Sequence, residues 1–182
     1  MTEALFDPDR WIAAWRFAAS AHHGQTFPGT ELPYLLHLGM VAMEVKGALA
    51  AEPGRNGDLA VLCALLHDSV EDTGVELDEI GRRFGAEVAA GVAALTKNGD
   101  LPKPERMPDS LRRIRSQPPE VWMVKLADRI TNLQPPPGHW TSEKASAYRD
   151  EARRIRDALG EASPYLRARI DAKIDAYEEF IR

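Results

Sequence analysis

Cysteine, basic charge and long apolar runs are all scarce in this sequence, and each scarcity excludes a class of protein. One cysteine, Cys63, in 182 residues excludes an intramolecular disulfide framework and any cysteine-rich metal site. Basic residues number 23 against 28 acidic ones, which gives a net charge of −5, whereas proteins that wrap DNA or RNA usually carry the opposite sign. The longest apolar run, residues 59–66, is far shorter than the roughly 20 residues that cross a membrane.

The N-terminus also lacks the character of a secretory signal, because MTEALFDPDR is acidic where such a signal would be basic. A chain of this length buries roughly 70% of the surface that its unfolded form exposes, which is enough for a core without disulfides or structural zinc. We therefore expect a cytoplasmic protein, with residues 1–182 forming one domain that neither enters a membrane nor wraps nucleic acid.

Helical periodicity dominates the chain, while alternation with a period of two is rare. Proline and glycine clusters separate segments that are rich in alanine, leucine, arginine and glutamate, which are good helix formers. The expected helices span roughly residues 9–23, 34–50, 59–72, 77–84, 86–95, 109–116, 121–133, 142–159 and 164–181. The apolar stripe of the last helix is expected to belong to the core rather than to a dimer seam (Tyr165, Leu166, Ile170, Ile174, Tyr177 and Ile181). The pattern predicts an all-α bundle of about eight to ten helices.

The segment LLHDSVEDTG, residues 65–74, concentrates ionisable side chains. On a continuous helix, residues four apart lie above one another, so His67 would stack with Glu71, and Asp68 with Asp72. Three carboxylates near the C-terminal end of a helix interact unfavourably with its dipole and lower its stability. A metal or catalytic site would explain why they are there. A solvated acidic helix end beside an ordinary, partly buried histidine explains the segment about equally well.

A second polar pair interrupts the apolar segment VWMVKLADRITNL. Asp128 is expected to be buried, and Asn132 follows it by one helical turn. An isolated buried carboxylate costs several kcal/mol unless it is paired or bound to a metal. Lys125 or Arg129 could instead neutralise it as an ordinary ion pair.

A third candidate is His37, which lies early in the second expected helix. Alone, such a histidine is more often a satisfied core residue than a ligand. With His67, Asp68 and Asp128, however, it completes a set of two imidazoles and two carboxylates from three helices. Donors of these kinds, without thiolates, suit Mn²⁺, Fe²⁺ or Zn²⁺ with open positions for water and substrate.

Five segments occur in order along the chain and carry a family resemblance. They are AHHGQ at 21–25, PYLLH at 33–37, LLHDSVEDT at 65–73, FGAEVAAGVAALTK at 84–97 and VKLADRITNL at 124–133. In these motifs the chain resembles the HD-domain metal-dependent phosphohydrolases, specifically the hydrolase domain of RelA/SpoT-type enzymes and their stand-alone small relatives. The C-terminal YRDEARRIRDALG also fits, so the resemblance spans nearly the whole chain.

The resemblance implies hydrolysis of guanosine tetra- and pentaphosphate alarmones, with release of the 3′-pyrophosphate and formation of GDP or GTP. It implies Mn²⁺ as the cofactor, with Fe²⁺, Zn²⁺ or Co²⁺ as other divalent ions for the same donors. The implied metal ligands are His37, His67, Asp68 and Asp128. The implied catalytic residues, which activate or orient the attacking water, are Glu71, Asp72 and Asn132. We expect no synthetase domain, and therefore degradation without synthesis.

The chain departs from the family pattern where the nucleotide is recognised. Thr26-Phe27 stands where a basic pair usually follows the AHxGQ stretch, and His37-Leu38 replaces the usual His-Pro. Phe27 could stack on a base, although packing on the core is the commoner role for a loop phenylalanine. The candidate substrate contacts are Phe27, Tyr34, Lys97, Lys125 and Arg129. The Arg112-Arg113-Arg115 cluster is a further candidate for phosphate, with a solvated face as its alternative.

Two alternative functions stay open from the sequence. One is hydrolysis of another phosphorylated nucleotide, and the other is a non-catalytic HD module that binds a nucleotide or a partner helix. In each case the expected ligand is a small phosphorylated nucleotide or a protein segment. The oligomeric state cannot be predicted from these patterns.

Overall fold

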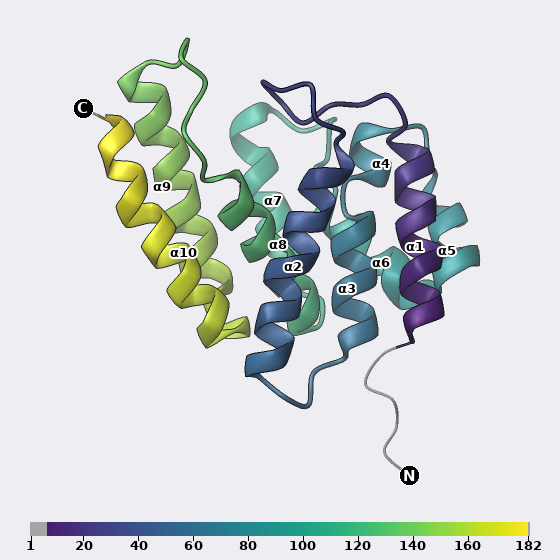
Figure 1. Cartoon of the computed structure of the whole chain (residues 1–182). Coiled ribbons are helices and arrows are strands. Elements are labelled where there is room, and N and C mark those ends of the chain that lie inside the picture. Colours follow the sequence, from purple (N-terminus) through teal and green to yellow (C-terminus); the bar gives the residue numbers. More distant parts are fainter. Residues whose placement is uncertain (1–6, 182) are drawn as a thin grey trace.

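Helices make up the regular structure of the computed structural model, which describes residues 7–181 (Figure 1). These residues contain no strand, and an isolated bridge joins Thr26 to Pro33. The helices are α1 (Pro8–Ala21), α2 (Leu35–Ala51), α3 (Gly57–Leu66), α4 (Ser69–Asp72), α5 (Leu77–Phe84), α6 (Ala86–Leu95), α7 (Lys103–Arg115), α8 (Pro119–Asn132), α9 (Ser142–Leu159) and α10 (Pro164–Ala176), with short 3-10 helices at Gly160–Ala162 and Tyr177–Ile181. The all-α prediction is confirmed.

Side-chain caps explain where several helices begin. Asp7 accepts hydrogen bonds from two backbone N–H groups of α1, and Asn56 accepts one from α3. Thr141 and Ser163 cap α9 and α10 in the same way. Each side chain satisfies a backbone donor that the helix itself leaves without a partner.

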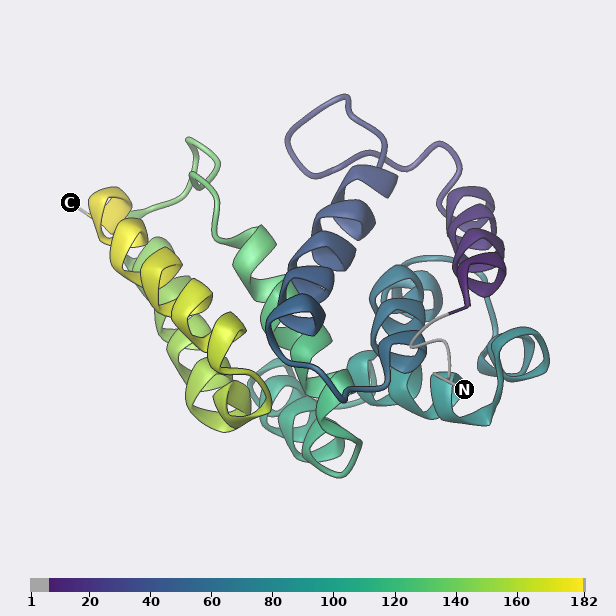
Figure 2. The same ribbon diagram turned by 60° about the horizontal axis from the view of Figure 1, so that its bottom comes forward.

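The core is built around α3, the helix of the long apolar run. Nine of its ten residues are buried, and only Asp58 is not. It packs against α1, α2, α6 and α8, while α9 and α10 lie side by side beyond α8 (Figures 1 and 2). The stripe on α10 is core as expected, since Leu166, Ile170 and Ile174 are all buried. None of the helices described is long and apolar enough to cross a membrane.

The expected single helix over residues 59–72 is wrong, because α3 ends at Leu66 and α4 starts at Ser69. Nδ1 of His67 donates to the Ala64 carbonyl at 2.9 Å, which takes a carbonyl from the helical ladder. Asp68 then has φ −98° and ψ −4°, which loosens the turn. The two ionisable residues therefore lie in a bend between helices, not on one straight helix face.

Helix α7 is longer than expected, because it begins at Lys103 rather than near Asp109. Pro104 stands in the first helical turn, where its missing N–H costs no hydrogen bond. Pro108 lies inside the helix, in its second turn. Because proline has no N–H, the backbone hydrogen bond that is lost is the one to a carbonyl of the first turn.

Close approach of three helices at Gly91 gives a prediction about stability. A Cβ atom on this residue of α6 would lie 2.6 Å from Sγ of Cys63 and 3.0 Å from Cγ2 of Val121. Gly91→Ala should lower the free energy of unfolding by about 1–3 kcal/mol, because a well-packed core cannot accept the extra atom. Urea denaturation followed by circular dichroism measures the change.

Gly81→Ala is the matched control, since the nearest atom to its Cβ would be Cβ of Ala89 at an ordinary 3.7 Å. There the better helix propensity of alanine should raise stability by roughly 0.5–1 kcal/mol. Adding Cys63→Ala to Gly91→Ala should recover part of the loss. Equal changes in the free energy of unfolding for the two glycine substitutions would show that the close approach at Gly91 does not affect stability.

Candidate metal centre

Four ionisable side chains converge where three helix ends meet. His37 lies in the first turn of α2, His67 and Asp68 in the bend after α3, and Asp128 in the last turns of α8. Nε2 of His37 is 3.5 Å from Oδ2 of Asp68 and 3.5 Å from Oδ1 of Asp128, while Nε2 of His67 is 2.8 Å from Oδ2 of Asp68. The ligand atoms of His37, His67 and Asp128 all lie within 4.8 Å of one another.

These spacings fit a shared metal ion. Two ligand atoms about 2.1 Å from a divalent ion lie about 3.0–3.5 Å apart at neighbouring corners of its coordination sphere. Because Nδ1 of His67 donates to a carbonyl, the lone pair of the neutral ring is on Nε2. That buried atom has no hydrogen-bond partner in the part of the chain described, although the Asp68 carboxylate is adjacent. A lone pair that faces a carboxylate is repelled unless positive charge lies between the two atoms. A proton on His67 meets this need, since burial lowers the pKa of His67 but the charge of Asp68 raises it above its usual value, and a metal ion bound to both atoms meets it equally.

The electrostatics of the cluster also favour a cation. Burial raises the pKa of the Asp128 carboxyl, but Lys125 and His37 outweigh burial and hold that pKa well below its usual range. Burial likewise raises the pKa of the Asp68 carboxyl. The charge of His67 and hydrogen bonds to His37 and His67 have the larger opposite effect, so the pKa of Asp68 lies below its usual value. Burial lowers the pKa of His37, whereas hydrogen bonds to Asp128 and Asp68 raise it to about 9. Both carboxylates are thus ionised at neutral pH and attract positive charge.

Neighbouring side chains hold both carboxylates in place. Asp128 accepts from Nζ of Lys125 at 2.8 Å through Oδ2 and from Nδ2 of Asn132 at 2.6 Å through Oδ1. Asp68 accepts from the Tyr34 hydroxyl at 2.6 Å. Of the two basic partners considered for Asp128, the structure pairs it with Lys125. This pair and the histidine cluster occupy different oxygens, so the ion pair and a metal site are compatible.

The two remaining acids of the motif differ in their surroundings. Both oxygens of Glu71 are engaged by Lys97, one by the backbone N–H at 2.8 Å and one by Nζ at 2.7 Å. Desolvation at the cavity and the negative charges of Asp68 and Glu71 raise the pKa of Asp72 above its usual value. A carboxylate with a raised pKa is a better proton acceptor, so Asp72 is the stronger candidate for a general base.

A cavity of about 330 Å³ joins these groups, and eleven of the twelve site residues expected from the sequence line it. The lining residues are Tyr34, His37, His67, Asp68, Glu71, Asp72, Leu95, Lys97, Lys125, Asp128, Arg129, Asn132, Tyr148 and Glu151. Phe27 is not among them. Its ring stacks on that of His37, with the ring centroids 5.9 Å apart. Arg113 is also elsewhere, because its guanidinium donates to carbonyls at the end of α6.

Sequence reasoning missed two residues that α9 brings to the cavity, Tyr148 and Glu151. Arg129 lies over the Tyr148 ring at 4.3 Å and forms an ion pair with Glu151. Nε and Nη1 of this buried arginine have no hydrogen-bond partner among the residues described. Arg129 lines the cavity, and two of its nitrogens keep hydrogen-bonding capacity that the described residues do not use. Both residues of α9 lie in YRDEARRIRDALG, which fits the family pattern, but only the packing of α9 on α8 shows that their side chains reach the cavity.

Comparison with known proteins agrees with this geometry. The model of a family described as HD domain matches residues 14–161. The guanosine-3′,5′-bis(diphosphate) 3′-pyrophosphohydrolase MESH1 of Mus musculus is 33% identical over 149 residues, which cover 79% of this chain and 81% of that protein. A guanosine-3′,5′-bis(diphosphate) 3′-pyrophosphohydrolase of Aquifex aeolicus is 33% identical over 66% of this chain, although the match covers only 17% of that protein.

A solved structure described as a metazoan ortholog of SpoT that hydrolyzes ppGpp has the same architecture. It superposes with a TM-score of 0.81 and 25% identity, and the match covers 98% of this chain and 100% of that one. Together, the family match, the relatives and the cluster of histidines and carboxylates show that this chain belongs to the HD-domain family and is a phosphohydrolase.

Proposed function

We propose that this phosphohydrolase removes the 3′-pyrophosphate of guanosine tetra- and pentaphosphate and leaves GDP or GTP. The names of its relatives describe this activity. The observation that carries the proposal is the convergence of two histidines and two carboxylates beside Asp72 in one cavity. A common core for α1 to α10 supports one HD-type domain, and a cytoplasmic location stays a prediction from the sequence.

We propose Mn²⁺ as the cofactor, held by His37, His67, Asp68 and Asp128. Two imidazole nitrogens and two carboxylate oxygens also suit Fe²⁺, Zn²⁺ or Co²⁺, so geometry alone does not select the ion. A divalent ion at this site supplies Lewis-acid chemistry, since it polarises a phosphoryl oxygen and acidifies a water molecule.

The protein side chains divide the remaining steps between them. Asp72 accepts a proton from the attacking water as the water oxygen forms a bond to the phosphorus next to the ribose. The bond between that phosphorus and the 3′-oxygen breaks, pyrophosphate leaves, and the 3′-oxygen takes up a proton that balances the one accepted by Asp72. Asn132 and Tyr34 keep the carboxylates of Asp128 and Asp68 oriented through their hydrogen bonds.

Basic residues around the cavity neutralise the phosphates in this proposal. Lys97 lies beside Glu71 and can exchange that carboxylate for a phosphate oxygen. Arg129 has two nitrogens without partners, and Lys125 adds charge beside Asp128. These three cations take over the role of the basic pair that Thr26-Phe27 replaces.

Product analysis tests the proposed reaction. Incubation with guanosine 3′,5′-bis(diphosphate) and Mn²⁺ should release pyrophosphate and GDP, and EDTA should abolish turnover because the metal is required. Asp68→Asn should lose the activity, whereas Asp78→Asn, on the exposed first turn of α5, should keep it. Release of orthophosphate, or turnover only of some other phosphorylated nucleotide, would overturn the alarmone assignment and leave the phosphohydrolase assignment in place.

Separating metal binding from proton transfer tests the role of Asp72. Asp72→Asn should lower kcat by about 10²–10⁴-fold, as expected for loss of a general base. Mn²⁺ affinity measured by calorimetry should change little. Asn132→Ala should instead weaken Mn²⁺ binding by about 10–100-fold, because the hydrogen bond that orients Asp128 is lost. Unchanged kcat in Asp72→Asn would exclude this residue as the base.

Substrate affinity tests the role of Arg129. Arg129→Gln should raise KM by about tenfold or more with a smaller effect on kcat, because a charge-assisted contact to phosphate is worth about 1.5–3 kcal/mol. The substitution also leaves Glu151 without its cation, so Arg129→Gln with Glu151→Gln serves as the matched control for folding. If the double variant recovers the wild-type KM, Arg129 serves only to neutralise Glu151.

A further inference from the structure

The exposed large apolar side chains come from α1, the loop after it and α2, and three of the five line one groove. Among residues 7–181 they are Ile12 and Trp15 on α1, Leu32 in the following loop, and Leu36 and Met43 on α2. Met43 is 73% exposed. Single exposed apolar residues are ordinary, but a group confined to one side of a protein marks a surface that something covers.

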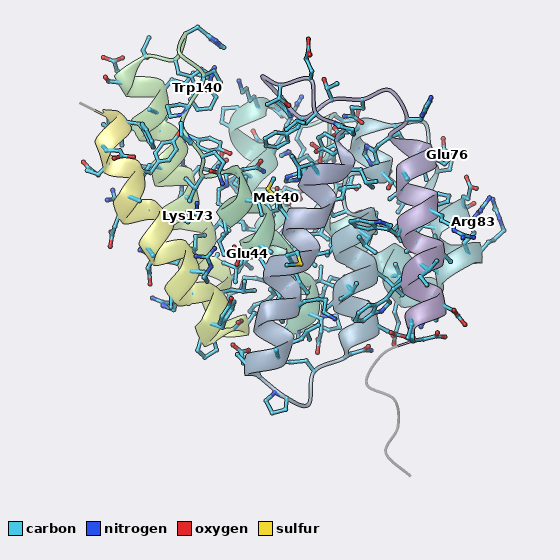
Figure 3. All side chains as sticks on the ribbon, in the orientation of Figure 1. Met40, Glu44, Glu76, Arg83, Trp140 and Lys173 are labelled. Carbon is cyan, nitrogen blue, oxygen red and sulfur yellow. The ribbon has the colours of Figure 1, made fainter. Side chains whose placement is uncertain are left out.

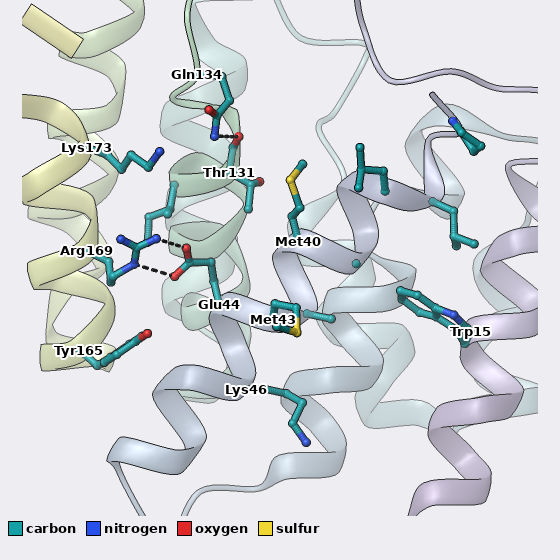
Figure 4. A pocket seen from close by; sticks show the side chains of 16 residues that line it. Trp15, Met40, Met43, Glu44, Lys46, Thr131, Gln134, Tyr165, Arg169 and Lys173 are labelled. Carbon is teal, nitrogen blue, oxygen red and sulfur yellow. Dashed lines mark hydrogen bonds and ion pairs between the residues drawn. The ribbon is translucent and has the colours of Figure 1, made fainter. Parts of the chain in front are cut away.

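A groove of about 1,050 Å³ includes part of this group. It lies between α2 and α10 with α8 as its floor, and it extends over α2 to Trp15 of α1 (Figure 4). Leu36, Met40 and Met43 form its apolar wall at helical spacing on α2. Figure 3 places Met40 and Glu44 on the α2 side and Lys173 on α10. Between Leu36 and Met43 the wall rises about 10 Å, which matches two turns of a docked helix.

The opposite wall is polar and basic. Tyr165, Arg169 and Lys173 repeat every four residues along α10 and face the groove. Arg169 is bound through two nitrogens to Glu44 across the groove, and Lys46 lines the α2 side. Of the three cations, Arg169 is paired with Glu44 and Lys46 lies over the Trp11 ring of α1 at 4.6 Å, so Lys173 carries the positive charge of the α10 wall on a chain whose net charge is −5.

An open groove of this kind suits a protein segment better than a small molecule. Small-molecule sites bury about 70–90% of their ligand, whereas side chains that line this groove, such as Trp15, Leu36 and Met43, are themselves exposed by 38–73%. An apolar wall with spacing i, i+4, i+7 is the counterpart of an amphipathic helix. The basic wall then selects acidic residues along one flank of that helix.

A second copy of the chain fits this surface less well. In a two-fold dimer the same surface meets itself, which brings the lysines of both copies together. Glu44 cannot balance them, because Arg169 already engages both of its oxygens. A contact with a different surface of a second copy forms a closed ring only for particular rotations, and otherwise leads to open chains of molecules.

The groove is separate from the catalytic cavity, and no residue lines both. The two sites nevertheless share helices α2 and α8. Thr131 lines the groove, and its hydroxyl lies 3.5 Å from Nδ1 of His37. A bound segment therefore leaves the catalytic cavity open while it contacts the helix ends that carry the metal centre.

We propose that the groove between α2 and α10 docks an amphipathic helix of another protein that presents an apolar stripe and an acidic flank. The proposal rests on the apolar wall of α2, the basic wall of α10 and the exposed residues beside them. It is independent of the reaction that the chain catalyses.

Two synthetic peptides of about 14 residues, or four helical turns, test the charge and the shape together. The first carries leucines at i, i+3, i+4 and i+7, glutamates along one flank and alanines elsewhere. The second has lysine in place of every glutamate. Calorimetry with the full chain should show binding of the acidic peptide, with a Kd on the order of 10–100 µM, and at least tenfold weaker binding of the basic one.

Variants on the two walls complete the test. Met43→Glu should weaken binding of the acidic peptide at least tenfold. Lys173→Glu should weaken the acidic peptide and strengthen the basic one, whereas Lys103→Glu, a matched reversal on exposed α7, should change neither. Binding of neither peptide, or equal binding of both, would overturn the proposal. So would a chain that is dimeric by sedimentation and becomes monomeric in Met43→Glu, because a second copy would then occupy the surface.

Discussion

The charge of two carboxylates in a largely enclosed site governs the arrangement of the rest of this protein. Asp128 is buried and Asp68 is half-buried, yet both stay ionised. An unpaired charge in such a place would cost several kcal/mol, so the surroundings have to supply positive charge and hydrogen-bond donors. His37 and His67 face the carboxylates, and Lys125 pairs with one of them. A divalent ion among the same donors completes this compensation.

The fold meets that requirement by ending helices at one point. The largely apolar α3 anchors the core, and its end at Leu66 places the next two residues in a bend rather than on a helix face. The start of α2 and the end of α8 reach the same bend, so the four donors come from segments that the core holds in fixed positions. A site of this kind tolerates little movement, because each donor depends on packing elsewhere in the domain.

An acidic chain that acts on an anionic substrate has to concentrate its positive charge. In the cavity this charge comes from Lys97, Lys125 and Arg129, each of which forms an ion pair with an acidic residue. A substrate phosphate can take the place of such an acid, and a metal ion can share the carboxylate of Asp128 with Lys125. In the groove it comes from the wall on α10. The net charge of −5 therefore describes the chain as a whole and not the two surfaces that would meet anionic ligands.

The sequence by itself determined the helical class, most helix positions and the identity of the clustered histidines and carboxylates, because periodicity and ordered motifs are local properties of the chain. Tertiary structure alone decided the bend at His67, which depends on a side chain that competes for a backbone carbonyl. It alone also brought Tyr148 and Glu151 to the cavity, since they lie on a helix distant in the sequence from the other site residues. It also decided that Phe27 packs on His37 outside the cavity lining, and that a groove lies between α2 and α10. These features arise from contacts between segments far apart in the chain, and no local pattern records which segments meet.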